Sequence, residues 1–323
     1  MWRIVLALLP LIAGGTVHAQ ELSLFGGGIQ QSGSNKNSHA WAFEYQHPLH
    51  ENILASFSWL NEGHLPGHHR DGQSLQIWGR SKLFRQRFSL AAGLGPYRYS
   101  DTIVSSPSGA YANAHGWGTV GSLAASYYAD SRWLYQLRFN RVVGNNSIDT
   151  NALMLGIGYQ LGNASGPLAD ATARRGGKRT GHEVTASFGF TIVNSDHSEH
   201  DTARALEYRH GLVPHVDMTV SLLNEGDPKL IRRTGIAAQL WGVHRFLAND
   251  RLALGIGVGP YLAIDRHRTS PTEVDERKLS SIFSAMAAYQ LSKQWNGRLS
   301  WNRINTDYNR DTDVILFGVG YRF

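Results

Sequence analysis

Polar and aromatic side chains that could carry charge or bind a ligand recur in two sets, one in each half of the 323-residue chain. The sets are Glu44, Glu62, Gln76, Trp78, Arg138 and Asn140, then Glu207, Glu225, Gln239, Trp241, Arg298 and Asn302. Carboxylates beside guanidinium groups can bind a hydrophilic solute or pair with one another, since either charge is costly to bury alone. The sequence therefore leaves two interpretations open: a charged lining for a passage, or a paired network that fills a narrow interior.

Other reactive residue types are absent or poorly placed. The chain has no cysteine, which excludes a disulfide framework, a thiolate zinc site and a thiol nucleophile. His64, His68 and His69 lie in one expected loop, but most of their counterparts in the second half are not histidine, so we expect solvated loop residues. We predict no catalytic residue, no metal and no cofactor.

The elements that must position the two sets are strands. From Glu21 onward, apolar residues alternate with polar or small ones over segments of about 8 to 12 residues, a period typical of half-buried strands. In residues 53–62 the apolar register includes Phe57 and Trp59, and Glu62 lies on the opposite register. A polar face recurs in nearly every strand, so there are too many polar-faced strands for a single dry core. A transmembrane barrel turns that face to its lumen and the apolar face to lipid.

The connections and the last strand support this assignment. Short connections such as residues 129–132 alternate with long ones such as residues 61–72, 99–116 and 265–278, the pattern of short periplasmic turns and longer outer loops. Apolar residues occupy every second position back from Phe323. This ending resembles that of bacterial outer-membrane β-barrel proteins, and the resemblance implies insertion by the barrel-assembly machinery. Aromatic residues near strand ends are expected to form the interfacial girdle: Trp41, Trp59, Trp133, Trp295 and Tyr321.

The chain also contains an internal repeat. Residues 60–63 (LNEG) match 223–226, residues 93–97 (GLGPY) match 257–261 (GVGPY), and Asp149-Thr150 matches Asp311-Thr312. Matches in one order at a nearly constant offset indicate duplication. Each unit holds about eight strands, so the fold class is an all-β transmembrane antiparallel barrel of about 16 strands. We expect one wide barrel, with two tandem eight-stranded barrels as the alternative.

The expected domain organisation follows from these patterns. Residues 1–19 have a positive start at Arg3, a short apolar stretch and small residues before Gln20, which predicts a cleaved signal peptide. Residues 20–162 and 182–323 are the two repeats, and the polar, Gly-rich segment 163–181 is a linker or long turn. The formal charge of +6 comes without clustered Lys and Arg, so no nucleic acid is expected as a partner.

Each eight-strand unit is also similar in architecture to the outer-membrane lipid A deacylases. That family carries a His-x-Ser-Asn motif on its penultimate strand, whereas the matching segments here begin Arg138-Phe139-Asn140 and Ser300-Trp301-Asn302. Asn stands where the catalytic base would be, and a serine without an imidazole to take its proton is a poor nucleophile. The likeness is therefore one of architecture.

These observations predict a bacterial outer-membrane channel or export pore for hydrophilic solutes, carbohydrate and polysaccharide among them. Outer-membrane lipid would surround the barrel, and the two sets of polar residues would line the path. The alternatives are a hydrolase that modifies lipid A in the outer leaflet and a filled barrel that serves a structural or surface-recognition role.

Overall fold

The structure is a computed structural model that describes residues 20–83, 87–105, 110–161, 180–228, 231–246, 251–266 and 275–323. The strands of the first repeat are β1 (Glu21–Gln31), β2 (Asn37–His50), β3 (Ile53–Leu65), β4 (His68–Leu83), β5 (Phe88–Ser105), β6 (Ala110–Tyr128), β7 (Trp133–Gly144) and β8 (Thr150–Gln160). Those of the second are β9 (His182–Val193), β10 (His200–Val213), β11 (Val216–Asn224), β12 (Arg233–Phe246), β13 (Leu252–Arg266), β14 (Asp275–Gln290), β15 (Trp295–Asn305) and β16 (Thr312–Arg322). Across these ranges no helix is long and apolar enough to cross a membrane.

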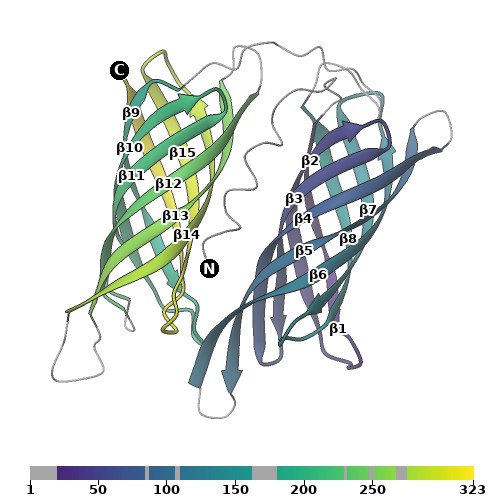
Figure 1. Ribbon diagram of the computed structural model, residues 1–323, viewed down its shortest axis with the longest axis horizontal. Coiled ribbons are helices and arrows are strands. Elements are labelled where there is room, and N and C mark those ends of the chain that lie inside the picture. The colour runs from purple at the N-terminus through teal and green to yellow at the C-terminus, as the bar shows by residue number, and fades with distance from the viewer. Residues whose placement is uncertain are drawn as a thin grey trace. The chain divides into compact units, whose positions relative to one another are not determined.

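The sixteen strands close into two separate antiparallel barrels, β1–β8 and β9–β16 (Figure 1). In the first, β8 returns to β1, with Gln160 opposite Glu21 and Thr150 opposite Gln31. In the second, β16 pairs with β9 from Thr312 to Arg322. The prediction of an all-β, duplicated, sixteen-strand protein is confirmed. The preference for one wide ring is wrong, and the alternative of two tandem eight-stranded barrels is correct, because each repeat saturates its own edge strands.

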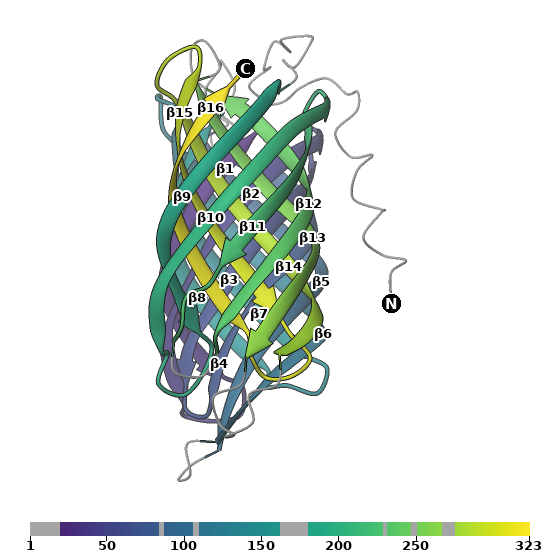
Figure 2. The ribbon, with the colours of Figure 1, turned by 90° about the vertical axis from the view of Figure 1, so that its left-hand side faces the viewer.

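The strands cross each barrel at a slant, as Figure 2 shows for β9–β14, and their side chains alternate between the two faces. In β7, buried and exposed residues alternate along the strand from Trp133 to Val143. Leu155 and Phe317 are 71% and 60% exposed on the outside, whereas Arg138 on the inward register of β7 is 1% exposed. The interiors also hold buried apolar clusters, among them Phe25 and Ile29 in the first barrel and Ile282 and Val314 in the second. An apolar exterior around an interior rich in polar side chains is the pattern of a barrel that sits in lipid.

The turns that follow the odd-numbered strands lie at one end of each barrel. The first strand of each barrel begins, and the last strand ends, at the other end. We name the first of these the outer end and the second the periplasmic end, after the usual placement of short turns and strand termini in such barrels. The expected outer loop 61–72 is mostly strand, since β3 and β4 continue to a turn at Pro66 and Gly67, where Gly67 has φ 84°. β5 and β6 likewise extend into the expected loop 99–116, and β13 and β14 into 265–278.

One expected lipid-facing aromatic residue is buried. Trp59 pairs with Phe43 on the outward register, yet it is only 1% exposed. Trp41, Trp133, Trp295 and Tyr321 are 44%, 45%, 47% and 38% exposed, as a girdle requires. The predicted signal peptide, residues 1–19, and nearly all of the predicted linker lie outside the described residues.

Candidate functional site in the barrel interiors

The structure brings the two sets of polar residues into the interiors of the two barrels. Eleven of the twelve are buried: Glu44, Glu62, Gln76, Trp78, Arg138, Asn140, Glu225, Gln239, Trp241, Arg298 and Asn302. Glu207 is the twelfth, and its side chain is 15% exposed. Strand pleating places them there, because residues two apart in a strand share a face. Within each barrel they fall into a cluster near the outer end and a cluster near the middle.

At the outer end of the first barrel, Glu62 is the centre of a buried cluster. The Arg70 guanidinium donates from Nε and Nη2 to its two carboxylate oxygens, with Nη2 2.9 Å from Oε1. The Tyr97 hydroxyl donates to Oε2 at 2.9 Å, and the Thr150 hydroxyl donates to Oε1. The side chains of Arg70 and Glu62 are 1% and 0% exposed. A bidentate ion pair joined by two hydroxyls satisfies both charges without water.

The second barrel repeats this cluster residue for residue. Arg233 donates from Nε and Nη2 to Glu225 at 2.6 and 2.7 Å. The Tyr261 hydroxyl donates to Oε1 at 2.8 Å and the Thr312 hydroxyl to Oε2 at 2.6 Å. We call Glu62, Arg70, Tyr97 and Thr150, and their four equivalents, the outer networks. Both networks draw residues from strands on opposite sides of their barrel, so each bridges the lumen.

The middle of the first barrel holds a second ion pair over an indole ring. Arg138 donates to both oxygens of Glu44, with Nη1 2.7 Å from Oε2. Its Cζ lies 4.8 Å from the centroid of the Trp78 ring, a cation–π arrangement. The Trp78 Nε1 donates to the Ser56 hydroxyl at 2.9 Å, so the indole is satisfied and held in place.

The second barrel builds the same contact from another strand. The Arg209 Cζ lies 4.5 Å from the Trp241 ring, and Trp241 Nε1 donates to the Thr219 hydroxyl at 2.9 Å. Arg209 also forms an ion pair with Asp217, 3.3 Å between Nη1 and Oδ2. Arg298 donates to both Glu183 and Glu207. Gln239, Ser284 and Asn302 form a hydrogen-bonded row beside them, with steps of 2.9 and 2.6 Å.

Glycine in the repeated GxGPY segment makes room for the two tryptophans. A Cβ added to Gly93 would lie 2.4 Å from Cδ2 of Trp78, and one added to Gly257 would lie 2.5 Å from Cδ2 of Trp241. No side-chain carbon approaches an aromatic carbon that closely, so any larger residue must displace the indole. The repeated motif therefore marks a packing requirement.

Sequence reasoning missed the partners that complete the outer networks. Arg70 was not among the predicted site residues, because 61–72 was expected to be a loop, and its equivalent Arg233 was not among them either. The signal was present in the repeat, since Arg70 and Arg233 are 163 positions apart, as are Glu62 and Glu225. Tyr97 and Thr150 lie in segments that the repeat also preserves. The preservation of a residue in both copies is thus a better guide to the site residues than the local strand pattern.

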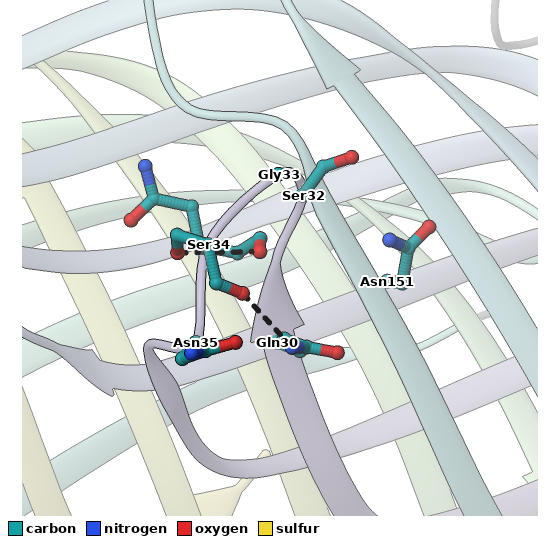
Figure 3. A pocket seen from close by; sticks show the side chains of 7 residues that line it. Gln30, Ser32, Gly33, Ser34, Asn35 and Asn151 are labelled. Carbon is teal, nitrogen blue, oxygen red and sulfur yellow. Dashed lines mark hydrogen bonds between the residues drawn. The ribbon is translucent and has the colours of Figure 1, made fainter.

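The structure also describes a polar hollow outside the lumen, at the turn between β1 and β2. It has a volume of about 320 Å³ and is lined by Gln30, Gln31, Ser32, Gly33, Ser34, Asn35 and Asn151 (Figure 3). The Gln30 amide donates to the Ser34 carbonyl at 2.9 Å. Among the described residues, Gln31 Oε1 has no hydrogen-bond partner. Neutral amides and hydroxyls are donors and acceptors suited to a hydroxyl-rich ligand.

The position of a deacylase base is occupied by an amide in both copies. Asn140 lies on the inward register of β7, and Asn302 on that of β15. The Asn302 side chain accepts from the Ser284 hydroxyl and donates to the Val314 carbonyl at 3.2 Å. An amide cannot take a proton from a hydroxyl at neutral pH, so neither Asn can act as a general base.

No protein-family model matches the sequence, and no curated protein matches it. Similar solved structures include the N-terminal β-barrel domain of OprF from Pseudomonas aeruginosa, at 13% identity and a TM-score of 0.37, covering 45% of this chain and 98% of that one. Ail, the attachment invasion locus protein of Yersinia pestis, is 16% identical with a TM-score of 0.34, covering 45% and 99%. The COG4313 outer membrane channel from Pseudomonas putida F1 is 12% identical with a TM-score of 0.23, covering 96% of each chain. Likenesses this distant carry no argument about activity.

The class of protein follows from the fold itself. Two closed antiparallel barrels, each with an apolar exterior and many polar side chains buried inside, define a β-barrel protein of the bacterial outer-membrane type that is duplicated within one chain.

Proposed function

We propose that the protein is an outer-membrane double barrel whose interiors are filled and whose outer end binds hydrophilic, carbohydrate-like material. The observation that carries the proposal is the pair of outer networks. Each spans its lumen, because a buried, hydrogen-bonded Glu–Arg pair on one side bonds the hydroxyl of Thr150 or Thr312 on the other. An eight-stranded barrel is only wide enough for its own side chains or one small ligand. With the interior occupied in this way, ligands would be met at the outer turns.

The hollow at the β1–β2 turn supplies a candidate binding surface. Its lining is uncharged and rich in amides and hydroxyls. Arg141 adjoins it, donating to the Ser32 hydroxyl at 3.3 Å and to Asn151 Oδ1 at 3.1 Å. Polysaccharide hydroxyls can replace such contacts at little cost, because each carries both a donor and acceptors. Surrounding outer-membrane lipid and insertion by the barrel-assembly machinery belong to the same proposal.

A passage for small hydrophilic solutes is the second candidate. Polar groups are found along the whole first barrel, from Glu21 near the periplasmic end, through Glu44, to Glu62 near the outer end. Opening such a path would require the outer network to separate. This candidate therefore predicts conduction that depends on Glu62 and Arg70.

Planar-bilayer recording of the full chain tests the proposal. Filled barrels should give no stable open-pore steps, whereas regular steps from the unmodified protein would overturn the proposal in favour of a channel. Binding is measured separately, by titrating neutral polysaccharide into detergent-solubilised protein. We expect Gln31→Ala with Asn151→Ala to weaken binding and Asn194→Ala, at the equivalent turn of the second barrel, to leave it unchanged. Equal binding by all three proteins would refute the role of the hollow.

A further inference from the structure

The outer wall of the first barrel carries an apolar groove on its lipid-facing side. The groove has a volume of about 380 Å³ and is lined by Phe88, Ala125, Ser126, Tyr127, Tyr135, Gln136, Leu137, Leu155 and Gly156. Its outward residues are exposed: Phe88, Tyr135, Leu137 and Leu155 are 47%, 51%, 47% and 71% accessible. This volume lies in the range of about 300 to 1,000 Å³ in which small-molecule sites fall. The groove is independent of the lumen and of the hollow at the outer end.

The strand register gives the groove a floor and a wall. Ala125, Leu137 and Leu155 are opposite one another across β6, β7 and β8, and the small Ala125 leaves the depression. One step nearer the periplasmic end, Tyr127 is opposite Tyr135. The Phe88 ring packs on Tyr127 with centroids 4.9 Å apart. Three aromatic rings therefore border the end of the groove that faces the short turn between β6 and β7.

Beyond the aromatic rings, the groove ends among charged residues. Arg87 directly precedes Phe88, and its side chain is 45% exposed. It forms an ion pair with Asp130, and its contact with the Tyr127 hydroxyl and the charge of Asp130 raise the pKa of its guanidinium. Arg132, on the turn between β6 and β7 that also carries Asp130, is half-buried. Two arginines and one aspartate leave a net positive charge where the headgroups of the periplasmic leaflet would lie.

We infer that this groove is a binding site for one anionic phospholipid of the periplasmic leaflet, with an acyl chain over Ala125 and the headgroup phosphate near Arg87 and Arg132. The apolar floor matches an acyl chain, because lipid tails and aliphatic side chains attract through close packing. Tyrosines at the boundary place an apolar ring against the chain and a hydroxyl toward the headgroup. Basic residues at the headgroup level attract anionic lipids.

The duplication supplies a built-in comparison. In the second barrel, Ala287 is opposite Leu299, as Ala125 is opposite Leu137. The remaining positions differ. Gly297 occupies the place of Tyr135, opposite Tyr289, and Phe317 occupies that of Leu155, opposite Leu299. Leu252, opposite Tyr289, occupies the place of Phe88. The second copy thus lacks two of the three aromatic rings of the wall and carries a larger residue on the floor, so the inference applies to the first barrel alone.

Native mass spectrometry of the full chain in detergent, titrated with phosphatidylglycerol, tests the site. We expect one retained lipid at low concentration, an affinity at least about tenfold lower for Ala125→Trp, which fills the depression, and no change for Ala287→Trp. Leu155→Phe, which copies the second barrel, is a milder second variant. Arg87→Gln with Arg132→Gln should lower the affinity for phosphatidylglycerol about tenfold and leave that for phosphatidylcholine unchanged.

Heat-dependent electrophoretic mobility establishes that each variant is folded. The inference would be overturned if Ala125→Trp bound phosphatidylglycerol as well as the unmodified protein does. It would also be overturned if the two tryptophan variants lost lipid equally, or if lipid A occupied the groove in preference to phosphatidylglycerol.

Discussion

Replacing Glu62 by Gln should destabilise the first barrel by about 3–5 kcal/mol, because the substitution leaves a buried charge without its partner. Arg70 is 1% exposed, so solvent does not screen the loss. Two of its nitrogens lose a charged acceptor, while the amide oxygen of Gln still accepts from Tyr97 or Thr150. Gln preserves the volume of Glu, so the cost should fall toward the lower end of the range. Glu62→Ala adds a cavity and should fall toward the upper end.

The assay is urea unfolding of the full chain in lipid vesicles, followed by tryptophan fluorescence and by electrophoretic mobility. Glu225→Gln is the matched variant in the second barrel and should cost about the same, since its contacts are the same. Replacing Glu62 and Arg70 together by apolar residues of similar size should cost much less than Glu62→Gln alone, because no unpaired charge remains. A cost below about 1 kcal/mol for Glu62→Gln would refute the reasoning, since surface pairs contribute only that much.

Three further predictions concern packing and orientation. Gly93→Ala should lower the free energy of unfolding by about 1–3 kcal/mol, because its Cβ would overlap Trp78, whereas Gly79→Ala, with no atom within 4 Å, should stay within about 0.5 kcal/mol; equal urea midpoints would contradict this. Trp78→Phe should cost about 1–3 kcal/mol, since Ser56 loses the indole donor and Arg138 a better cation–π surface; far-ultraviolet circular dichroism checks that the barrel persists. Phe317→Arg, on the outer face, should cost about 2–4 kcal/mol in vesicles, and an unchanged stability there would place this face away from lipid.

The facing of the strands could be predicted from sequence, and the number of barrels could not. A period of two fixes which residues share a face, so the inward position of residues such as Arg138 and Gln239 followed from their neighbours. Closure of the first barrel depends on whether β8 pairs with β1 or with β9. These two strands are equivalent, because they belong to the two copies of one repeat. Both are apolar–polar alternating segments of similar length, so pairing of β8 with either is consistent with the pattern. Only the spatial register, Glu21 opposite Gln160, decides it.

Only the glutamate of each outer network was predicted from sequence, for a related reason. Glu62 lies before a positive-φ glycine, Gly63, in a stretch whose polar residues and glycines are typical of a loop. The strand nevertheless continues, because the β3–β4 pairing resumes beyond the irregularity, with His64 opposite His69. Arg70 thereby returns to the inward face, eight residues after Glu62. Trp59 shows the limit of the same logic, since its register is outward while its exposure is 1%.

In each barrel an arginine covers the equivalent tryptophan, but the arginine comes from a different strand. This suggests a test of whether another strand of the first barrel can supply the charge. In the first barrel Arg138 of β7 covers Trp78, and in the second Arg209 of β10 covers Trp241. The residue at the place of Arg209 in the first copy is Gln46. It is buried and opposite Ser56, the acceptor of the Trp78 indole, just as Arg209 is opposite Thr219.

We therefore expect Gln46→Arg to rescue Arg138→Ser. Alone, Arg138→Ser leaves Glu44 buried and unpaired and should cost about 3–5 kcal/mol. An arginine at position 46 lies two residues from Glu44 on the same face, the spacing at which Arg209 bonds Glu207 at 3.1 Å between Nη2 and Oε1. The double variant should recover at least half of the loss in urea unfolding, while Gln46→Lys, a point charge without the planar fork, should recover less. A double variant as unstable as Arg138→Ser alone would show that the rest of each interior, and not the Arg–Glu–Trp contact, sets which strand supplies the charge.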